Sequence, residues 1–392
     1  MASLRRVTIN GFRGARDVVL EPGHLCVLVG ESSSGKSTVL SAIWALLEAA
    51  APMPTGADVS RGHTRVHVEA EVGGSTLFLD ARPPSTLNLN REGAPPTLYF
   101  PASLRPTTLL APTDHESTRA VRIVRDDNHT EDGGLALIRA ISALVEASIR
   151  GVVVLVEEPE LYLSPPAQRH LNRLLGRLTA RNQVLYSTHS AAFLGVESLN
   201  DLVLVRHDER TGTRLLQPEA LTQKQTFRMF AEFDAERAEI FLSRAVLFVE
   251  GRTEKLAFPF IFQALGFDID HEAISIIDCS GKGNMPLFAE ICNACEIPYV
   301  IVHDRDAPRG TAPMEAEQIA NDAILRVAGR KRTVALVPDF EGVAGLRGRR
   351  GKPAAAWKRF QGGDAEVPGT LRQAVERVVA AAHRAPRTTR GA

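Results

Sequence analysis

The sequence predicts an α/β fold in which two domains follow one another along the chain. Near-continuous apolar runs occur over 24–30, 151–160 and 182–190, and helical segments lie between them. Such runs are typical of strands that are buried on both faces of a sheet. A second alternation of strands and helices begins near residue 245. This alternation predicts parallel sheets joined by crossover helices.

The first half also contains weaker elements. A short alternating strand is expected over 4–10, and the helix over 37–50 repeats Leu40, Ile43 and Leu47 at helical spacing. The other expected elements are antiparallel strands over 64–72 and 75–80, a turn-rich loop over 83–96, helices over 135–149 and 166–180, a hairpin over 201–216 and a charged helical stretch over 217–243. Segment 99–112 gives no clear signal.

The second half repeats the strand and helix pattern. Strands are expected over 245–251, 273–280, 299–306 and 333–340, and Gly266 closes a helix over 253–266. The last residues resemble a frayed tail. The expected division is a first domain over 1–215, a helical linker over 216–244, a second domain over 245–383 and a disordered tail over 384–392.

The composition is that of an ordinary globular protein. Four cysteines in 392 residues argue against a secreted disulfide scaffold. No apolar run reaches the ~18–20 residues needed to cross a bilayer, and the first ten residues lack the apolar core of a signal peptide. We therefore expect a cytoplasmic protein without a membrane partner. The balance of 46 basic and 46 acidic residues excludes a uniformly basic nucleic-acid coat but permits a local basic face.

A phosphate-binding loop is predicted at GESSSGKS, residues 30–37. The string fits G-x-x-x-x-G-K-[ST], follows a buried strand and opens a helix, which is the context that the motif requires. Backbone N–H groups of small residues can curl around phosphate oxygens, Lys36 would reach the β- and γ-phosphates, and Ser37 would hold Mg²⁺. The residues expected to bind ATP here are Gly30, Ser33, Ser34, Gly35, Lys36, Ser37 and Thr38. The alternative is a Gly/Ser turn without a ligand.

Two further strand ends carry polar residues. The run VVVLVEEPE delivers Glu157 and Glu158 to the carboxyl end of its strand, where ligands bind in open α/β sheets. We expect Glu157 to position Mg²⁺ through water and Glu158 to polarise the attacking water. His189 ends another buried strand and is a candidate sensor of the γ-phosphate. Solvated carboxylates and a structural histidine are the competing interpretations.

These elements, with ELYLSPPAQRHL after the carboxylates, resemble the ABC-type ATPase head of SMC-like and RecF-like proteins over about 1–205. The resemblance implies a head that forms a dimer and completes each site with a Gly-containing signature loop from its partner. TEDGG at 130–134 lies where that loop should be, but matches it only loosely. Glu157 and Glu31 stand where Asp and Pro are more common, and no Gln occurs between the phosphate loop and Glu157. Dimer closure and its coupling to ATP therefore stay open.

A second group of acids ends the strands of the C-terminal half. Glu250 is followed one helical turn later by Glu254, and two more strands end in Asp304 and Asp306 and in Asp339 and Glu341. If these strands are parallel neighbours, their acidic side chains converge, repel one another and favour a hard divalent cation such as Mg²⁺ or Mn²⁺. Two such ions could support phosphodiester cleavage. Asp339 is equally consistent with a turn, and Asp278, also at a strand end, is interpreted as structural.

The E-G and D-x-D motifs on successive strands resemble the Toprim fold. A phosphate-loop head followed by a Toprim domain resembles the OLD (overcoming lysogenization defect) family of ATP-dependent endonucleases. The stretches FRGARD, EEPELYLSP, FLSRAVLFVEGRTEK, SGKGNMPLF and IPYVIVHDRD carry this resemblance. It implies metal binding by Glu250, Glu254, Asp304, Asp306 and Glu341, and assistance by Lys352, which could stabilise the charge of the phosphorane. The alternative is that Lys352 is a solvated residue of a basic loop. The segment between the phosphate loop and Glu157 is shorter than in fuller family members, which leaves the oligomeric state open.

A basic stretch, 347–360, is a candidate DNA surface. It holds Arg347, Arg349, Arg350, Lys352, Lys358 and Arg359, with Trp357 and Phe360 among or beside them. This composition suits contact with the phosphate backbone without sequence reading, although charge runs are usually solvated faces. The pairs Cys292 with Cys295 and His63 with His67 lack further metal ligands, so we interpret them as structural.

The leading hypothesis is an ATP-regulated, divalent-metal-dependent DNA endonuclease that assembles as a homodimer or larger oligomer through its heads. The family resemblance implies a role in phage defence. The alternatives are a non-cleaving DNA-binding ATPase of RecF or SMC type and a sensor ATPase that controls a separate effector or helicase partner. A topoisomerase is disfavoured, because no separate domain presents a nucleophilic tyrosine among the four tyrosines.

Overall fold

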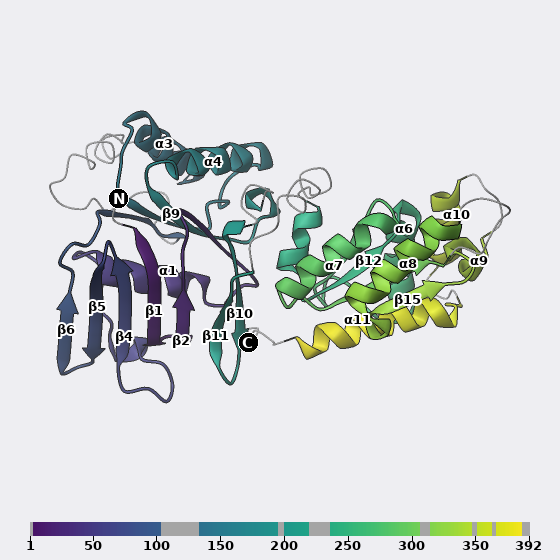
Figure 1. Cartoon of the computed structure of the whole chain (residues 1–392), viewed down its shortest axis with the longest axis horizontal. Coiled ribbons are helices and arrows are strands. Elements are labelled where there is room, and N and C mark those ends of the chain that lie inside the picture. The colour runs from purple at the N-terminus through teal and green to yellow at the C-terminus, as the bar shows by residue number, and fades with distance from the viewer. Residues whose placement is uncertain are drawn as a thin grey trace. The chain divides into compact units, whose positions relative to one another are not determined.

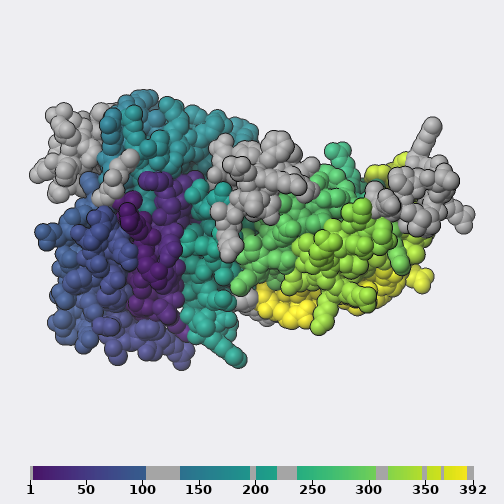
Figure 2. Space-filling model, viewed as in Figure 1, coloured from purple at the N-terminus to yellow at the C-terminus, as the bar shows by residue number. Residues whose placement is uncertain are grey.

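The computed structural model (Figure 1) describes residues 3–102, 133–194, 200–218, 236–305, 314–346, 351–362 and 366–385. The chain divides into two compact units, one within Met1–Ala220 and one within Leu221–Pro386, and Figure 2 colours their surface from purple to yellow along the chain. None of the described helices is long and apolar enough to cross a membrane.

The first unit contains an antiparallel sheet with the strand order β2-β1-β4-β5-β6. Its strands are β1 (Leu4–Phe12), β2 (Ala15–Leu20), β4 (Val66–Val72), β5 (Ser75–Arg82) and β6 (Thr86–Asn90). The alternating buried and exposed residues of β4 and β5 give this sheet one buried face. The expectation of antiparallel strands over 64–72 and 75–80 is therefore confirmed by β4 and β5.

A second sheet in the same unit has the order β11-β10-β3-β9-β8-β7 and is parallel except for the β10–β11 hairpin. Its strands are β3 (Leu25–Val29), β7 (Thr97–Phe100), β8 (Val153–Glu157), β9 (Gln183–Thr188), β10 (Leu202–Asp208) and β11 (Gly212–Leu216). The described helical elements are η1 (Gly56–Asp58), α1 (Lys36–Leu47), α3 (Gly133–Glu146), α4 (Pro165–Leu178) and η4 (Ala191–Phe193). Helix α1 contacts strands of both sheets, so the two sheets share one core.

The second unit is built on a parallel sheet with the order β13-β12-β14-β15, as the sequence predicts. Its strands are β12 (Ala245–Val249), β13 (Ile274–Asp278), β14 (Tyr299–Asp304) and β15 (Thr333–Leu336). The surrounding helical elements are η6 (Arg237–Leu242), α6 (Arg252–Ala264), η7 (Lys282–Asn284), α7 (Met285–Ala294), α8 (Met314–Ala328), η8 (Arg330–Arg332), α9 (Phe340–Ala344), α10 (Lys352–Phe360) and α11 (Gly369–Arg384).

Both faces of this sheet are covered, which explains why its strands are apolar throughout. Leu247 belongs to the core that α6 and α11 complete, whereas its neighbour Phe248 packs against Phe288 of α7 and Tyr299 of β14. Successive side chains of a strand point to opposite faces, so a strand covered on both sides needs an unbroken apolar run.

Three strands depart from expectation. The expected loop over 83–96 contains the edge strand β6, and β2 and β7 were not foreseen. Strand β6 has mostly exposed side chains and therefore carries no clear apolar alternation. In the stretch 217–243, which is expected to be helical, residues 219–235 lie outside the described part, and Arg237–Leu242 forms a 3-10 helix.

Candidate functional site

The phosphate loop joins β3 to α1 in the first unit. Ser33, Gly30 and Gly35 have left-handed φ values of 62°, 153° and 108°. A Cβ atom on Gly30 would overlap the Val205 carbonyl, and one on Gly35 would overlap Thr213 Oγ1. These two positions therefore require glycine both for backbone conformation and for the close approach of the β10–β11 hairpin.

Lys36 begins α1 and turns back into the loop. Its side chain is buried, and Nζ donates hydrogen bonds to the carbonyls of Gly30 (3.0 Å) and Glu31 (2.8 Å). Burial lowers the lysine pKa to about 8, against the opposing effect of the nearby carboxylates of Glu158, Glu160 and Glu31. Of the other predicted nucleotide contacts, Ser34 is buried, Ser33 is exposed, and Ser37 and Thr38 are partly exposed in the first turn of α1.

The paired glutamates after β8 have different surroundings. Glu157 is buried: the Tyr99 hydroxyl donates to its Oε1 at 2.6 Å, and the Ala102 N–H donates to its Oε2 at 3.1 Å. Glu158 is about 29% exposed, and its Oε1 lies 3.9 Å from His189 Nε2. The structure thus brings Glu158 and His189 together at neighbouring strand ends, as the sequence predicts.

His189 is in a neutral state at physiological pH. Its pKa is lowered to about 4, chiefly because the imidazole is buried and also because Lys36 carries a positive charge nearby. A neutral imidazole can donate one hydrogen bond to a phosphate oxygen without adding a charge.

Glu160, the third acid of the EEPE string, is a further functional residue that the sequence patterns do not predict. Its Oε1 accepts from the His189 N–H at 2.6 Å, and its Oε2 accepts from the Thr188 hydroxyl at 2.9 Å. Burial raises its pKa above the ordinary value. The carboxylate therefore ties the loop after β8 to the end of β9 and fixes the backbone that carries His189.

Part of the predicted signature loop can also be placed. Residues 130–132 lie outside the described part, whereas Gly133 and Gly134 begin α3. A Cβ on Gly134 would come within 2.6 Å of the Leu163 side chain, so this glycine allows α3 to pack closely on the loop that precedes α4.

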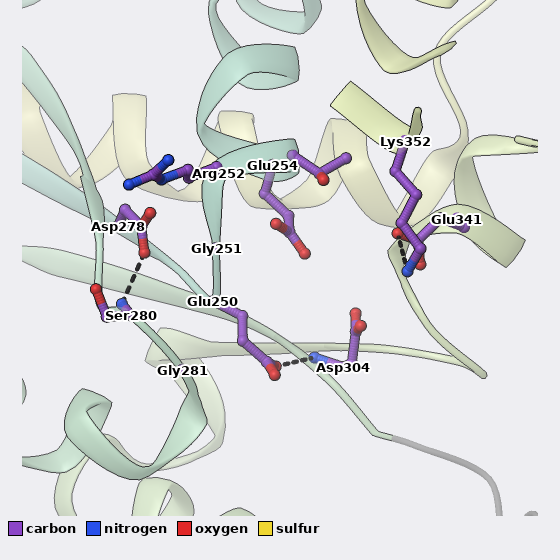
Figure 3. Close-up of a pocket in the computed structure, with 11 residues that line it drawn as sticks. Glu250, Gly251, Arg252, Glu254, Asp278, Ser280, Gly281, Asp304, Glu341 and Lys352 are labelled. Carbon is purple, nitrogen blue, oxygen red and sulfur yellow. Dashed lines mark hydrogen bonds and ion pairs between the residues drawn. The ribbon is translucent and has the colours of Figure 1, made fainter. Parts of the chain in front are cut away.

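The second unit has a cavity of about 440 Å³ at the carboxyl ends of its parallel strands (Figure 3). Glu250 follows β12, Asp304 ends β14, and Glu254 lies in the first turn of α6. Among the described residues, the lining consists of Glu250, Gly251, Arg252, Thr253, Glu254, Asp278, Ser280, Gly281, Asp304, Glu341 and Lys352. The cavity thus gathers five residues of the predicted set together with Asp278, which the sequence suggests to be structural.

Hydrogen bonds hold several of these acids in place. Glu250 Oε2 accepts from the Asp304 N–H at 3.3 Å, and Asp304 Oδ1 accepts from the Phe340 N–H at 2.8 Å. Lys352 Nζ lies 2.7 Å from Glu341 Oε1, and this hydrogen bond raises the lysine pKa. Figure 3 shows Lys352 and Glu341 facing one another across from Glu254.

Glu254 has the most perturbed carboxyl of the cavity. Its side chain is 8% exposed, and its pKa is raised to about 7, first by burial and then by the charges of Glu250, Glu341 and Asp278. Carboxylates that destabilise one another in this way fit a hard divalent cation. Within the described ranges, however, no three His, Cys, Asp or Glu side chains already converge on one metal position.

The remaining predicted residues fall outside this arrangement. Asp306 and the three arginines at 347–350 lie outside the described residues. Asp339 caps α9 by accepting from the Gly342 N–H at 2.8 Å and does not line the cavity. Cys292 and Cys295 are buried in the core, consistent with a structural role, and His67 faces Glu69 and Asp80.

The chain is similar to known proteins in both halves. The family model "Overcoming lysogenization defect protein-like, TOPRIM domain" matches residues 241–306. The model "AAA domain, putative AbiEii toxin, Type IV TA system" matches 124–195, and a protein family of unknown function matches 2–55.

Two curated relatives are named as OLD nucleases. The one from Thermus scotoductus is 33% identical over 247 residues, which cover 57% of this chain and 47% of the relative. The one from Escherichia phage P2 is 28% identical over 169 residues, 41% of this chain and 29% of the relative. The chain therefore spans about half, or less, of the length of these relatives.

Solved structures with a similar chain path include an SMC head domain from Thermotoga maritima, with 16% identity and a TM-score of 0.38 over 55% of this chain and 99% of that one. The C-terminal region of the Burkholderia pseudomallei OLD protein has 18% identity and a TM-score of 0.27 over 36% of this chain and 99% of that one.

Proposed function

Because the chain combines the ATPase head and the Toprim domain of the OLD family, we propose that it is an ATP-regulated, divalent-metal-dependent endonuclease that cleaves DNA in the cytoplasm. The observation that carries the proposal is the acidic cavity at the carboxyl ends of β12, β13 and β14, with Lys352 at its rim. Phage defence is the biological role in keeping with this family.

In the head, the proposed roles follow from position and charge. Lys36, at the start of α1, binds the β- and γ-phosphates of ATP together with the loop N–H groups. Glu158 accepts a proton from the attacking water, and neutral His189 donates a hydrogen bond to the γ-phosphate. Ser37 and Glu157 would hold Mg²⁺ at this site.

In the second unit, Glu250, Glu254, Asp304, Asp306 and Glu341 would hold Mg²⁺ or Mn²⁺. When bound, such ions lower the pKa of water and neutralise charge on the scissile phosphate. Lys352 donates to a non-bridging oxygen and stabilises the pentacovalent transition state. The basic stretch 347–360 contacts the DNA backbone, and pairing of two heads into a homodimer lets ATP control access to the cavity.

A plasmid-nicking assay tests the proposal. The full chain is incubated with supercoiled plasmid and Mg²⁺ or Mn²⁺, with ATP, ADP or no nucleotide. Glu250→Ala should reduce nicking at least ~100-fold because it removes a carboxylate from the cavity. Glu376→Ala, an exposed glutamate of α11, is the matched control and should cut as the unaltered chain does. Equal cutting by Glu250→Ala and by the unaltered chain would contradict the proposal.

The same assay examines a second function, a non-cleaving DNA-binding ATPase. DNA binding without nicking in every metal and nucleotide condition would support it.

A further inference from the structure

The β10–β11 hairpin packs directly against the phosphate loop, although it lies far from that loop in the sequence. Strand β10 runs parallel to β3, with Leu204 opposite Val29, so that the next residue, Val205, passes over Gly30. The facing strand, β11, brings Thr213 against Gly35. Both invariant glycine positions of the motif therefore face this hairpin.

Thr213 is the polar link between the hairpin and the loop. Its side chain is 1% exposed, and its Oγ1 donates a hydrogen bond to the Ser34 carbonyl at 3.1 Å. Its backbone N–H donates to the Gly14 carbonyl at 2.8 Å, which ties the same residue to the β1–β2 turn. Thr213 is thus held in place by its backbone while its hydroxyl holds the loop.

The geometry of the peptide bond gives this contact a consequence for phosphate binding. The Ser34–Gly35 peptide is planar and trans, so its C=O and N–H groups point in opposite directions. A carbonyl drawn toward Thr213 therefore turns the Gly35 N–H away from the hairpin. Backbone N–H groups of this loop are the donors that cradle phosphate oxygens.

We propose that Thr213 is a positioning residue for nucleotide binding: its hydroxyl holds the Ser34 carbonyl and thereby aims the Gly35 N–H at a phosphate oxygen. The inference rests on the proposed ATP-binding function of the head. Thr213 lies 179 positions after its partner Ser34 and is not part of the phosphate-loop motif, so it adds a residue to the nucleotide site.

The test compares ATP and ADP binding, in Mg²⁺, by the unaltered full chain and its variants. Thr213→Val keeps the shape of the side chain but removes the donor, and should weaken both nucleotides about 5-fold, the effect of one neutral hydrogen bond. Thr213→Ser keeps the donor and should bind within about 2-fold of the unaltered chain. Thr179→Val removes a hydroxyl that donates to the Gly176 carbonyl at 2.7 Å outside the phosphate loop, and should leave binding unchanged.

A kinetic readout separates positioning from general stability. Thr213→Val should raise the KM for ATP while kcat at saturating ATP changes less than about 2-fold, whereas a folding defect would lower the active fraction and kcat.

If the valine variant does not fold, Thr213→Ala removes the same donor without adding bulk, and the same 5-fold loss is expected. Unchanged ATP affinity in the folded donor-free variants, or an equal loss in Thr213→Ser, overturns this inference alone. No ATP binding by the unaltered chain overturns the proposed function and this inference with it.

Discussion

Replacing the buried Glu254 with glutamine should stabilise the metal-free protein at neutral and alkaline pH. The carboxyl is 8% exposed in the first turn of α6, and its pKa is raised from 4.5 to about 7 by burial and by neighbouring carboxylates. Ionisation of this group in the folded protein is therefore unfavourable. Glutamine has a similar shape and no charge, so it removes this penalty.

The size and sign of the effect follow from linkage between protonation and folding. In the unfolded chain the carboxyl loses its proton near pH 4.5, whereas in the folded protein it keeps the proton until about pH 7. Folding stability is therefore lost as the pH rises from 4.5 to about 7, and no more is lost above that range. A difference of this size in pKa corresponds to ~3 kcal/mol.

Urea denaturation in EDTA between pH 5 and 8 measures this difference. The chain has two tryptophans, so Trp44→Phe leaves Trp357 of α10 as the reporter for the unit that contains α6. The free energy of unfolding of Glu254→Gln, relative to the parent, should rise by roughly 2–3 kcal/mol across this range, because part of the full difference is already present at pH 5. Glu376→Gln, on the exposed face of α11, should show no such rise. A constant difference between Glu254→Gln and the parent at every pH would refute the reasoning.

Three other predictions concern the head and the core. Glu158→Gln should lower the kcat of ATP hydrolysis at least ~100-fold with unchanged ATP affinity, measured by phosphate release and calorimetry, because it removes the proposed general base. Glu160→Gln should lower kcat about 10-fold by weakening the charged hydrogen bond to the His189 backbone, with ATP affinity again preserved. Phe258→Ala should destabilise the second unit by ~3–5 kcal/mol, measured by urea denaturation with Trp357 fluorescence, because it leaves a cavity between α6 and Phe340.

The second unit was largely predictable because its strands are buried on both faces. Such strands must be apolar throughout, and the sequence shows this without ambiguity at β12 and β14. Parallel neighbours end at the same edge of a sheet, so acids at their ends had to lie close together. The same reasoning places Asp278, at the end of β13, in the lining of the cavity, where its Oδ1 accepts a hydrogen bond from the Ser280 N–H at 2.7 Å.

Other features depend on contacts that no local pattern contains. Strand β6 is recognisable only from its pairing with β5, since its own side chains are mostly exposed. Thr213 looks like an ordinary strand residue until the hairpin is placed on the phosphate loop. Glu160 lies two residues after the predicted catalytic Glu158, but its hydrogen bonds to Thr188 and His189 reach the end of a strand that begins more than 20 residues later.

The acids of the cavity relieve their mutual repulsion in different ways. Backbone N–H groups bind Glu250 and Asp304, and the ammonium of Lys352 neutralises Glu341. Glu254, buried among them, instead retains its proton up to about pH 7. A divalent cation in the cavity must displace that proton, so the affinity for Mg²⁺ or Mn²⁺ should rise with pH until about 7 and then level off. For the proposed nuclease, the pH at which nicking reaches its plateau should therefore depend on the deprotonation of Glu254 as well as on the attacking water, and titration of the chain with Mg²⁺ between pH 5 and 8 measures the first contribution alone.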